Sequence, residues 1–523
     1  MTEESSLREN ELTRKQRYII KRIIVRGTLA LDTPTCLGSG DAESPTDLPL
    51  LRDSISDRAL LTGSSIAGAL RNYLREREHG YMASEYADDL ATLLFGGMRS
   101  DYDGNQSPLI VDDAISNKPI KTELRDGVKI NSATGTAADK AKYDLELLQA
   151  ETEFALSFEL LIEKTEDEAR LVKALAIALA GLEPKKDPSV SECENVSKSG
   201  EICLGMKKRR GFGRCQVKEW QVWNFNLEDA GDRMAWLTLD HSWLTDPPCS
   251  KPPAVDASIV EAMKKAGLGV AEDWKDKRDR FLIHATFKLA GSLLIRSGQD
   301  STGRAPDVVH LKSHRHNETN PVSVLSGTSL AGVLRHRAER IINTLEKPTS
   351  IIDEVFGPDF SKDKSKQAKA SRLVVHEKVI KDATELVQNR IAIDRFTGGA
   401  YHGALFEEQP IFGGDETIVT IELELRNPYN HEIGLLLLLL KDLWTSDLPV
   451  GGESSIGRGR LQGKNATLNL YKWDKENNLQ HKETWAIAQL GENQPLEVSD
   501  PSRLEKIVQE LVTYSLEEVK GNE

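Results

Sequence analysis

The feature that most constrains the fold of this chain is a helix-start motif that occurs twice. "LLTGSSIAGALRNYLRERE" occupies residues 60–78, and "VLSGTSLAGVLRHRAERII" occupies residues 324–342. Both begin with glycine and hydroxyl residues that a plain amphipathic helix does not need. A motif that returns at such a distance suggests an internal duplication, in which the chain repeats one whole folding unit.

The surroundings of the two motifs repeat in the same order. Strand-like runs precede the motifs, Phe-Gly dipeptides follow them, and each copy continues with alternating strands, a very apolar helix and a Gly-x-Gly-Arg loop. These features lie at 22–31, 95–96, 153–164, 171–182 and 211–214 in the first copy, and at 281–295, 356–357, 416–427, 433–444 and 457–460 in the second. The order of elements is that of a ferredoxin-like α+β fold, the plan of RNA-recognition modules. We therefore predict an α+β protein with two tandem ferredoxin-like domains.

Composition shifts divide the chain of 523 residues, which is long enough for more than one domain, into four segments. We predict a first domain over residues 1–227, a proline-marked linker over 228–280, a second domain over 281–480 and an acidic C-terminal extension over 481–523. Two polar loops, 183–203 and 359–371, are interpreted as insertions.

Charge and apolar content limit the classes of function. The net charge of −14 argues against non-specific binding of polyanions over the whole surface, but it allows a local basic stripe such as "GMKKRRGFGR" at 205–214. The first residues lack the apolar stretch of a secretory signal, and the longest apolar run, 433–440, is too short to span a bilayer. We therefore expect a cytoplasmic protein without a membrane partner. The five cysteines contain no C-x-x-C pair, which argues against a disulfide framework or a standard zinc site.

Each helix start has the composition of a phosphate-binding site. Glycine permits a tight turn, hydroxyl side chains cap free amides, and a second glycine leaves the helix face open. Free N–H groups at a helix N-terminus attract phosphate, and an arginine further along adds charge. The alternative is that the small residues only allow tight packing on the sheet. The predicted contacts are Gly63, Ser64, Ser65, Gly68 and Arg71 in the first copy, and Gly327, Thr328, Ser329, Gly332 and Arg335 in the second.

The two glycine-rich loops are the second predicted RNA contact. Backbone amides of such a loop can surround a phosphate, while arginine makes a forked contact with it. Neither copy has a Walker or dinucleotide fingerprint, so nucleotide hydrolysis is not supported. The predicted residues are Lys207, Lys208, Arg209, Arg210, Gly211, Gly213 and Arg214, and Gly457, Arg458, Gly459 and Arg460.

Together these motifs resemble one family, the RAMP-type backbone subunits of type III CRISPR effector complexes. The resemblance is carried by "LTGSSIAGALR" and "LSGTSLAGVLR", by "FGG" and "FGP", by "IDRFTGGA" at 393–400, and by the final "GFGR" and "IGRGR". It covers the chain apart from both tails and the linker. Length and tandem arrangement are most similar to the fused double-backbone subunit of a type III-D complex. The resemblance implies RAMP domains with thumb hairpins near residues 125–150 and 390–410.

The resemblance also implies a function and a set of partners. Each domain would hold the CRISPR guide RNA (crRNA) in an antiviral ribonucleoprotein complex, and the thumbs would displace nucleotides of the paired target RNA. A loop aspartate after the first strand would promote target cleavage with Mg²⁺ or another divalent cation. By position the aspartates are Asp47 and Asp307, with Asp41 and Asp300 as open alternatives, and Arg395 in the second thumb would contact RNA. Implied partners are crRNA, target RNA, further backbone subunits, the large signalling subunit and small subunits.

Two other functions are open at this stage. The chain could be a non-catalytic scaffold that only binds guide RNA beside subunits that cut. It could also be a stand-alone RNA-processing endonuclease, which would need a general-base histidine early in the chain, where the first copy offers His79. In the guide-directed reaction, a carboxylate would take the proton of a 2′-hydroxyl or hold a Mg²⁺, and scission would leave a cyclic phosphate and a 5′-hydroxyl.

Overall fold

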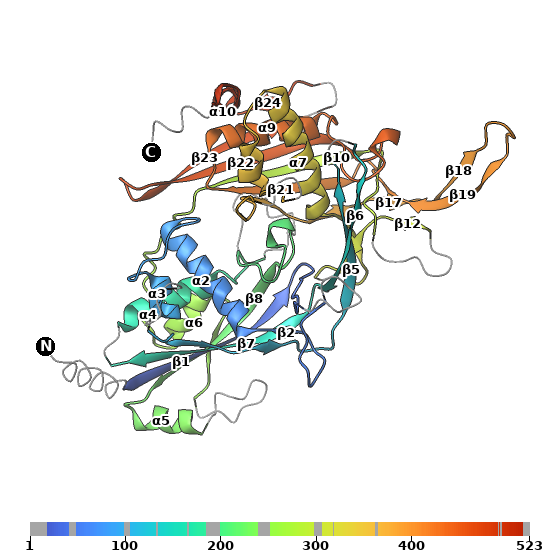
Figure 1. Ribbon diagram of the computed structural model, residues 1–523. Helices are drawn as coiled ribbons and strands as arrows, with labels where there is room; N and C mark the ends of the chain where they lie inside the picture. The colour runs from blue at the N-terminus through green and yellow to red at the C-terminus, as the bar shows by residue number, and fades with distance from the viewer. Residues whose placement is uncertain are drawn as a thin grey trace.

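The structure is a computed structural model that describes residues 18–40, 49–98, 105–131, 134–164, 167–184, 199–238, 251–297, 306–316, 318–360, 365–489, 491 and 494–515. Its described part forms two lobes, one for each copy of the motif (Figure 1). The first copy forms the blue-to-green lobe, and the second forms the yellow-to-red lobe. The duplication is therefore a duplication of folded units.

The first lobe is built on an antiparallel sheet with the strand order β3-β7-β1-β8-β9. Residues along β1 alternate between two apolar layers: Ile23 and Val25 join the main core with α2 and α4, whereas Ile24 packs toward α5. The elements are β1 (Ile19–Leu31), β2 (Leu60–Leu61), α2 (Gly63–His79), α3 (Leu90–Phe95), β3 (Leu109–Val111), β4 (Ala114–Ile115), β5 (Thr122–Ile130), β6 (Ala137–Leu148), β7 (Glu153–Glu163), α4 (Glu168–Ala180), the 3-10 helix η1 (Lys208–Arg210), β8 (Cys215–Asn226), α5 (Ala230–Leu237), β9 (Ala254–Asp256) and α6 (Ile259–Lys265).

The second lobe repeats this arrangement in a larger sheet with the order β13-β14-β16-β21-β10-β22-β23-β24, with β15 also paired to β21. Strand β10 lies between β21 and β22, just as β1 lies between β7 and β8. The elements are β10 (Arg280–Ala290), β11 (Ser292–Leu293), β12 (Val308–Val309), β13 (Lys312–Ser313), β14 (Val322–Leu325), α7 (Gly327–Thr344), α8 (Ser350–Phe356), β15 (Leu373–Val375), β16 (Lys378–Lys381), β17 (Thr384–Glu385), β18 (Gln388–Ile393), β19 (Ala400–Gln409), β20 (Ile411–Phe412), β21 (Ile418–Arg426), α9 (Asn430–Trp444), η3 (Ser454–Ile456), β22 (Arg460–Asp474), β23 (Leu479–Ala488), β24 (Glu497–Val498) and α10 (Pro501–Thr513).

The most apolar segments are core helices, as their composition predicts. In α9, Leu435, Leu436 and Leu439 are buried between the sheet and α10. Residues of β7 and β21 alternate between buried and partly buried along each strand, which is the period-two pattern seen in the sequence. Among the helices that the structure describes, none is both long and apolar enough to cross a membrane.

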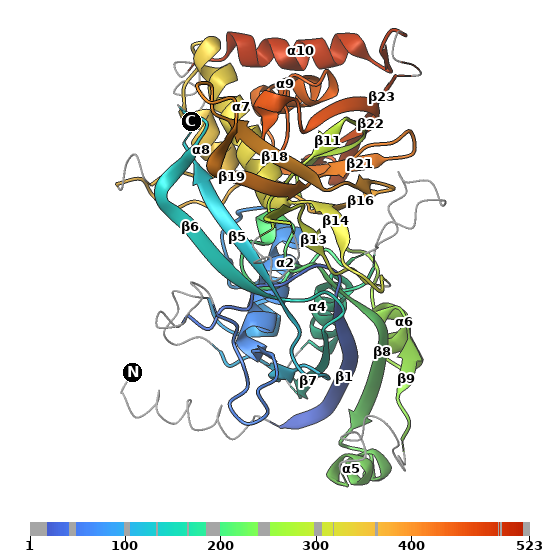
Figure 2. The ribbon, with the colours of Figure 1, turned by 90° about the vertical axis from the view of Figure 1, so that its right-hand side faces the viewer.

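Both segments expected to form thumbs are antiparallel hairpins. The β18–β19 hairpin projects from the second lobe (Figure 1), and Phe396 near its tip is fully exposed. The β5–β6 hairpin leaves the first lobe and runs up beside the second (Figure 2). Lys129 near its end pairs with Asp359, with 2.9 Å between Nζ and Oδ1. The first hairpin therefore lies against the second copy, whereas the second hairpin reaches outward.

The segments predicted as linker and extension contribute regular structure to the lobes. Strand β9 extends the first sheet beside β8, and α6 packs against α4 and β8. Strand β24 pairs with β23, and α10 packs on α9. The domain boundaries themselves remain predictions.

A backbone contact joins the two copies at the glycine-rich loop of the first. A Cβ atom at Gly211 would lie 2.3 Å from the backbone nitrogen of Glu377, and a Cβ atom at Gly327 would lie 2.3 Å from the carbonyl oxygen of Arg210. Because no side chain fits at such distances, glycine is required at both positions. The loop of one copy thus rests directly on the helix start of the other.

A buried ion cluster stabilises the same interface. Arg125 at the base of the first hairpin donates to Glu377 of the second copy (Nη1–Oε2, 2.9 Å) and to Glu123 (Nε–Oε1, 3.0 Å), and Arg315 also pairs with Glu377. Burial alone would raise the pKa of Glu377, but the guanidinium groups of Arg125 and Arg315 outweigh it, so this pKa lies below its usual value. The carboxylate is therefore charged and doubly paired inside the interface.

Replacing Glu377 with Gln should destabilise the protein strongly, because the buried Arg315 loses its carboxylate and Arg125 keeps only Glu123. We expect the free energy of unfolding to fall by about 3 kcal/mol or more, measured by urea denaturation. The matched control is Lys129→Met, which removes an inter-copy pair whose lysine side chain is 46% exposed and should cost less than about 1 kcal/mol. Equal losses in the two variants would contradict the assigned importance of the cluster.

Candidate nucleic-acid interface

The start of α2 has an anionic partner from its own chain. The N–H of Gly63 donates to Asp113 Oδ1 at 2.6 Å, and Oγ1 of the N-cap residue Thr62 accepts from the N–H of Ser65 at 3.3 Å. A Cβ atom at Gly63 would lie 2.2 Å from the carbonyl oxygen of Val111. Gly63 is therefore a close-packing residue whose amide is already bonded, which differs from the free amide that we expected there.

The start of α7 is covered by the first copy. Gly327 is buried, and a Cβ atom there would meet the carbonyl oxygens of Arg210 and Val375. Thr328 and Ser329 are half-buried next to it. Sequence reasoning missed this use of Gly327 because the loop that requires it belongs to the other copy.

The second glycine of each motif does face open space. A Cβ atom at Gly68 or Gly332 would have no atom within 4 Å, and both residues are exposed. Ser64 and Ser65 are exposed one turn earlier on α2. These residues remain accessible candidates for contact with an RNA backbone.

Arg71 and Arg335 make the same internal bond in both copies. Arg71 Nη2 donates to the carbonyl of Gly97 at 3.0 Å, and Arg335 Nη1 donates to the carbonyl of Gly357 at 2.7 Å. Both carbonyls belong to the turn at the Phe-Gly dipeptide. The arginine and the dipeptide recur together in both copies, and this joint repetition is the sequence signal for the contact. The bond fastens the helix to the turn at the dipeptide. A role of either arginine in RNA binding remains a prediction.

The basic loop of the first copy is largely directed toward the second. Arg209 and Arg210 donate to the carbonyls of Ser371 and Leu373, and Arg214 Nη1 lies 3.7 Å from Glu422 Oε2. Lys207 Nζ lies 4.0 Å from the ring centre of Tyr143, and Lys208 is exposed. Gly211 and Gly213 are both buried against backbone. Within this set, Lys208 is the most accessible cation.

The glycine-rich loop of the second copy is more open. A Cβ atom at Gly457 would meet no atom within 4 Å, and Arg460 is exposed. Arg458, by contrast, is 4% exposed and pairs with Glu408 (2.9 Å) and Glu453 (3.2 Å). Gly459 is packed on the carbonyl oxygen of Val450. Arg458 therefore holds the base of the β18–β19 hairpin, and Arg460 remains available.

Of the four candidate catalytic aspartates, Asp307 alone lies within the described residues; Asp41, Asp47 and Asp300 fall outside them. Asp307 is exposed, and its Oδ2 accepts the N–H of Glu407 at 2.9 Å. The next residues form β12, which pairs in parallel with the end of β19. The N–H of Glu407 thus bonds Asp307, and the carboxylate of its neighbour Glu408 pairs with Arg458. The loop aspartate, the β18–β19 hairpin and the glycine-rich loop of the second copy therefore meet at one place.

A cavity of about 130 Å³ lies beside this place and is lined by His310, Lys312, Glu385 and Gln409, among others. His310 is 2% exposed; its Nδ1 accepts the N–H of Ile295 at 3.2 Å, and its buried Nε2 has no partner. Burial lowers the pKa of His310 to about 4, so the ring is neutral near pH 7. Lys312 Nζ pairs with Glu385 Oε1 at 2.7 Å.

The surroundings of Asp307 suit a hydrated divalent cation better than a preformed cage. Oδ2 is held by Glu407, and no trio of ligand side chains that includes Asp307 exists in the part of the chain that the structure describes. Mg²⁺ commonly keeps several waters and binds through one or two carboxylates together with substrate phosphates. The residues around Asp307 fit this hydrated mode of binding.

Comparison with known proteins agrees with the tandem organisation. A family model described as the RAMP superfamily matches residues 28–216 and 286–462, one match in each copy and well over half of the chain together. No curated protein matches the chain.

The buried His310 should make stability depend on pH. Its pKa in the folded state, about 4, lies below the ordinary value of 6.5, so the unfolded chain binds the proton more tightly and stability is lost as pH falls through this window. In His310→Asn, where the amide oxygen can replace Nδ1 as acceptor, the drop in Tm between about pH 7 and about pH 5 should be smaller than in the wild type. The exposed residue His402 provides the control, His402→Asn, whose drop should match the wild type. Identical drops in all three proteins would refute the interpretation.

Proposed function

The chain belongs to the RAMP superfamily, and on this premise we propose that it is a type III backbone subunit, a fused pair like that of type III-D complexes, that holds crRNA and cleaves paired target RNA. Proteins of this superfamily are associated with RNA binding in CRISPR complexes, and some are endoribonucleases. We also propose that each copy is ferredoxin-like. The matching strand orders, with β1 between β7 and β8 and β10 between β21 and β22, support that plan.

The observation that carries the catalytic part of the proposal is the meeting of three motifs at Asp307. The exposed carboxylate is fixed by the N–H of Glu407 at the base of a projecting hairpin. Phe396 is fully exposed near the hairpin's tip, and Arg395 beside it is exposed too. An aromatic ring and a guanidinium group are the side chains that stack on bases and pair with phosphates. An RNA strand along this hairpin would pass close to the carboxylate.

The proposed reaction uses the ribose of a nucleotide that the hairpin displaces from its helix. Asp307 accepts the proton of the 2′-hydroxyl, whose oxygen attacks the adjacent phosphorus, and the bond to the 5′-oxygen breaks. The 5′-oxygen takes up a proton, so the products are a 2′,3′-cyclic phosphate and a 5′-hydroxyl. A bound Mg²⁺ would supply charge stabilisation at the phosphate. The bond from Glu407 keeps Asp307 in one orientation, which lowers the cost of reaching the reactive geometry.

The contact between the copies supports the proposal of further protein partners. The loop of the first copy is covered by α7 and β15 of the second, whereas η3 of the second copy presents an exposed Ile456 and the open Gly457. A further backbone subunit that offers its own helix start would cover this loop in the same way. The large signalling subunit and the small subunits belong to the same proposal.

A non-catalytic scaffold is the second candidate function. It is favoured by one observation, namely that Oδ2 of Asp307 already accepts the N–H of Glu407, a bond that a purely structural aspartate would also make. In that case the chain would bind guide and target RNA, and other subunits would cut.

Asp307→Asn should abolish cleavage at one target position and leave guide binding unchanged. The amide oxygen can still accept from Glu407, but it cannot take a proton or bind a cation well. The measurement is the size pattern of labelled target RNA in the assembled complex, with Asp47→Asn expected to remove a second position. The exposed Asp415, whose side chain is 95% exposed, provides the control Asp415→Asn, which should cut normally. If both candidate variants retain the wild-type fragment pattern, the chain is a scaffold.

Arg460→Ala should weaken guide binding and reduce its salt dependence. One lost phosphate contact changes the slope of log K against log salt by about 0.7 to 0.9, whatever the guide sequence. Titrations at several salt concentrations measure the slope, and Lys506→Ala on α10, another exposed cation, should leave it unaltered. An unchanged slope in Arg460→Ala would remove this residue from the RNA path.

A further inference from the structure

Glu78, His79 and Asp89 bring three metal-ligating side chains together far from the hairpins. Glu78 and His79 are the last two residues of α2, and Asp89 is the N-cap residue of α3. Their ligand atoms all lie within 4.8 Å of one another, with 2.7 Å from His79 Nε2 to Asp89 Oδ1 and 3.5 Å from His79 Nε2 to Glu78 Oε2. No other such trio occurs among the described residues.

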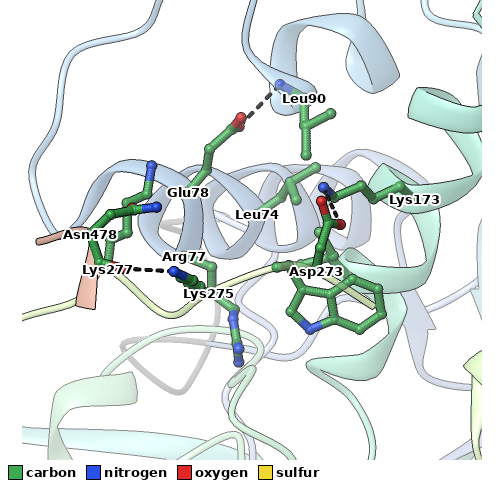
Figure 3. Close-up of a pocket in the computed structure, with 11 residues that line it drawn as sticks. Leu74, Arg77, Glu78, Leu90, Lys173, Asp273, Lys275, Lys277 and Asn478 are labelled. Atoms are coloured by element: carbon green, nitrogen blue, oxygen red, sulfur yellow. Dashed lines mark hydrogen bonds and ion pairs between the residues drawn. The ribbon is translucent and has the colours of Figure 1, made fainter. Parts of the chain in front are cut away.

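The backbone holds both carboxylates in place. Glu78 Oε2 accepts the N–H of Leu90 at 3.0 Å, a bond visible in Figure 3, and Asp89 Oδ2 accepts the N–H of Tyr86 at 2.8 Å. Each carboxylate therefore has its second oxygen, Glu78 Oε1 or Asp89 Oδ1, outside these bonds. Such outer bonds typically orient the ligands of a metal site.

The imidazole nitrogen is the second, independent sign of a ligand. His79 Nε2 is buried and makes no hydrogen bond, although Asp89 Oδ1 is only 2.7 Å away. The contact between His79 Nε2 and Asp89 Oδ1 is therefore close but is not aligned as a hydrogen bond. A cation between the three groups would satisfy this nitrogen.

The spacing and charge of the trio suit a small divalent ion. Ligands at about 2.1 Å from a tetrahedral Zn²⁺ lie about 3.4 Å apart, so the distance between His79 and Glu78 already fits, whereas Asp89 Oδ1, at 2.7 Å from His79 Nε2, would have to move away from the imidazole. The nearby Arg77 is already engaged by Tyr73 and Glu201.

A cavity adjoins the trio at Glu78, the one member of the trio that lines it. It measures about 220 Å³ and is lined by Glu78 and Leu90 at the trio, by Lys173 and Asp273 on the opposite side, and by Lys277 and Asn478 at its edge. Figure 3 shows Glu78 reaching from α2 across to the backbone of Leu90 at this cavity. A hydrated ion can therefore approach, and a water can complete its coordination.

We propose that Glu78, His79 and Asp89 bind a divalent transition-metal ion, with Zn²⁺ as the preferred ion. The bound ion fastens the end of α2 to the start of α3. One imidazole and two carboxylates suit Zn²⁺, whereas Mg²⁺ prefers an all-oxygen octahedral set. The site does not depend on the proposed RNA cleavage, because its ligands lie on other elements than Asp307. The role of the ion is structural. By fixing the end of α2, it would hold the helix that carries Gly68 and the exposed serines at its other end.

The test uses the full chain, freed of tags and treated with a chelator, and the probes are Zn²⁺ and Co²⁺. We expect uptake of about one Zn²⁺ per chain, a rise in Tm on adding it, and with Co²⁺ an absorption spectrum of nitrogen and oxygen ligation without a thiolate band. His79→Ala should abolish uptake at this site. The control is His481→Ala, an exposed histidine that pairs with Asp474 and whose loss should leave uptake unchanged.

The second variant, Glu78→Gln, separates loss of metal binding from loss of folding, because its amide oxygen can still accept the N–H of Leu90. Its metal-free Tm should stay close to that of the wild type, while its affinity for Zn²⁺ should fall at least about tenfold. The proposal is overturned if the wild type takes up no Zn²⁺, if His79→Ala binds it equally well, or if the cobalt spectrum shows thiolate ligation. In those cases the trio is only a close contact between His79 and two carboxylates.

Discussion

The buried carboxylate of Glu377 holds the two halves of this protein in one arrangement. Arg125 reaches it from the first copy and Arg315 from the second, and the glycine-rich loop with Gly211 packs on the backbone beside it. Isolated buried charges are costly, but here two guanidinium groups, of Arg125 and Arg315, compensate two carboxylates, of Glu377 and Glu123. The arrangement works in one geometry only, so it fixes the first hairpin against the second lobe and thereby fixes the distance between the two candidate RNA sites.

The sequence predicted the elements of the fold well, because its signals are local. Period-two strands at 153–164 and 416–427 and the apolar helices at 171–182 and 433–444 are all found within a few residues of the expected places. Repetition also supplied the tandem organisation, which the family comparison supports. Because the duplication repeats each local pattern, a weak pattern in one copy could be supported by its counterpart in the other.

The candidate site was predicted less completely, since its geometry depends on contacts between distant residues. Gly63 and Gly327 were interpreted as phosphate-binding glycines, yet the described backbone around them shows that close packing requires both. The bond between Asp307 and Glu407 joins residues that are 100 positions apart, and no local pattern announces it. The ligand trio of Glu78, His79 and Asp89 was not predicted at all, because the spacing of Asp89 from the other two matches no metal motif.

Fusion of the copies changes what kind of contact can join them. When two subunits meet as separate chains, the interface must also offset the lost translational and rotational freedom. Covalent linkage replaces that loss by a high effective concentration, so even a weak interface between the copies can stay closed. The ion cluster around Arg125 can therefore serve the alignment of the two lobes rather than the strength of their association.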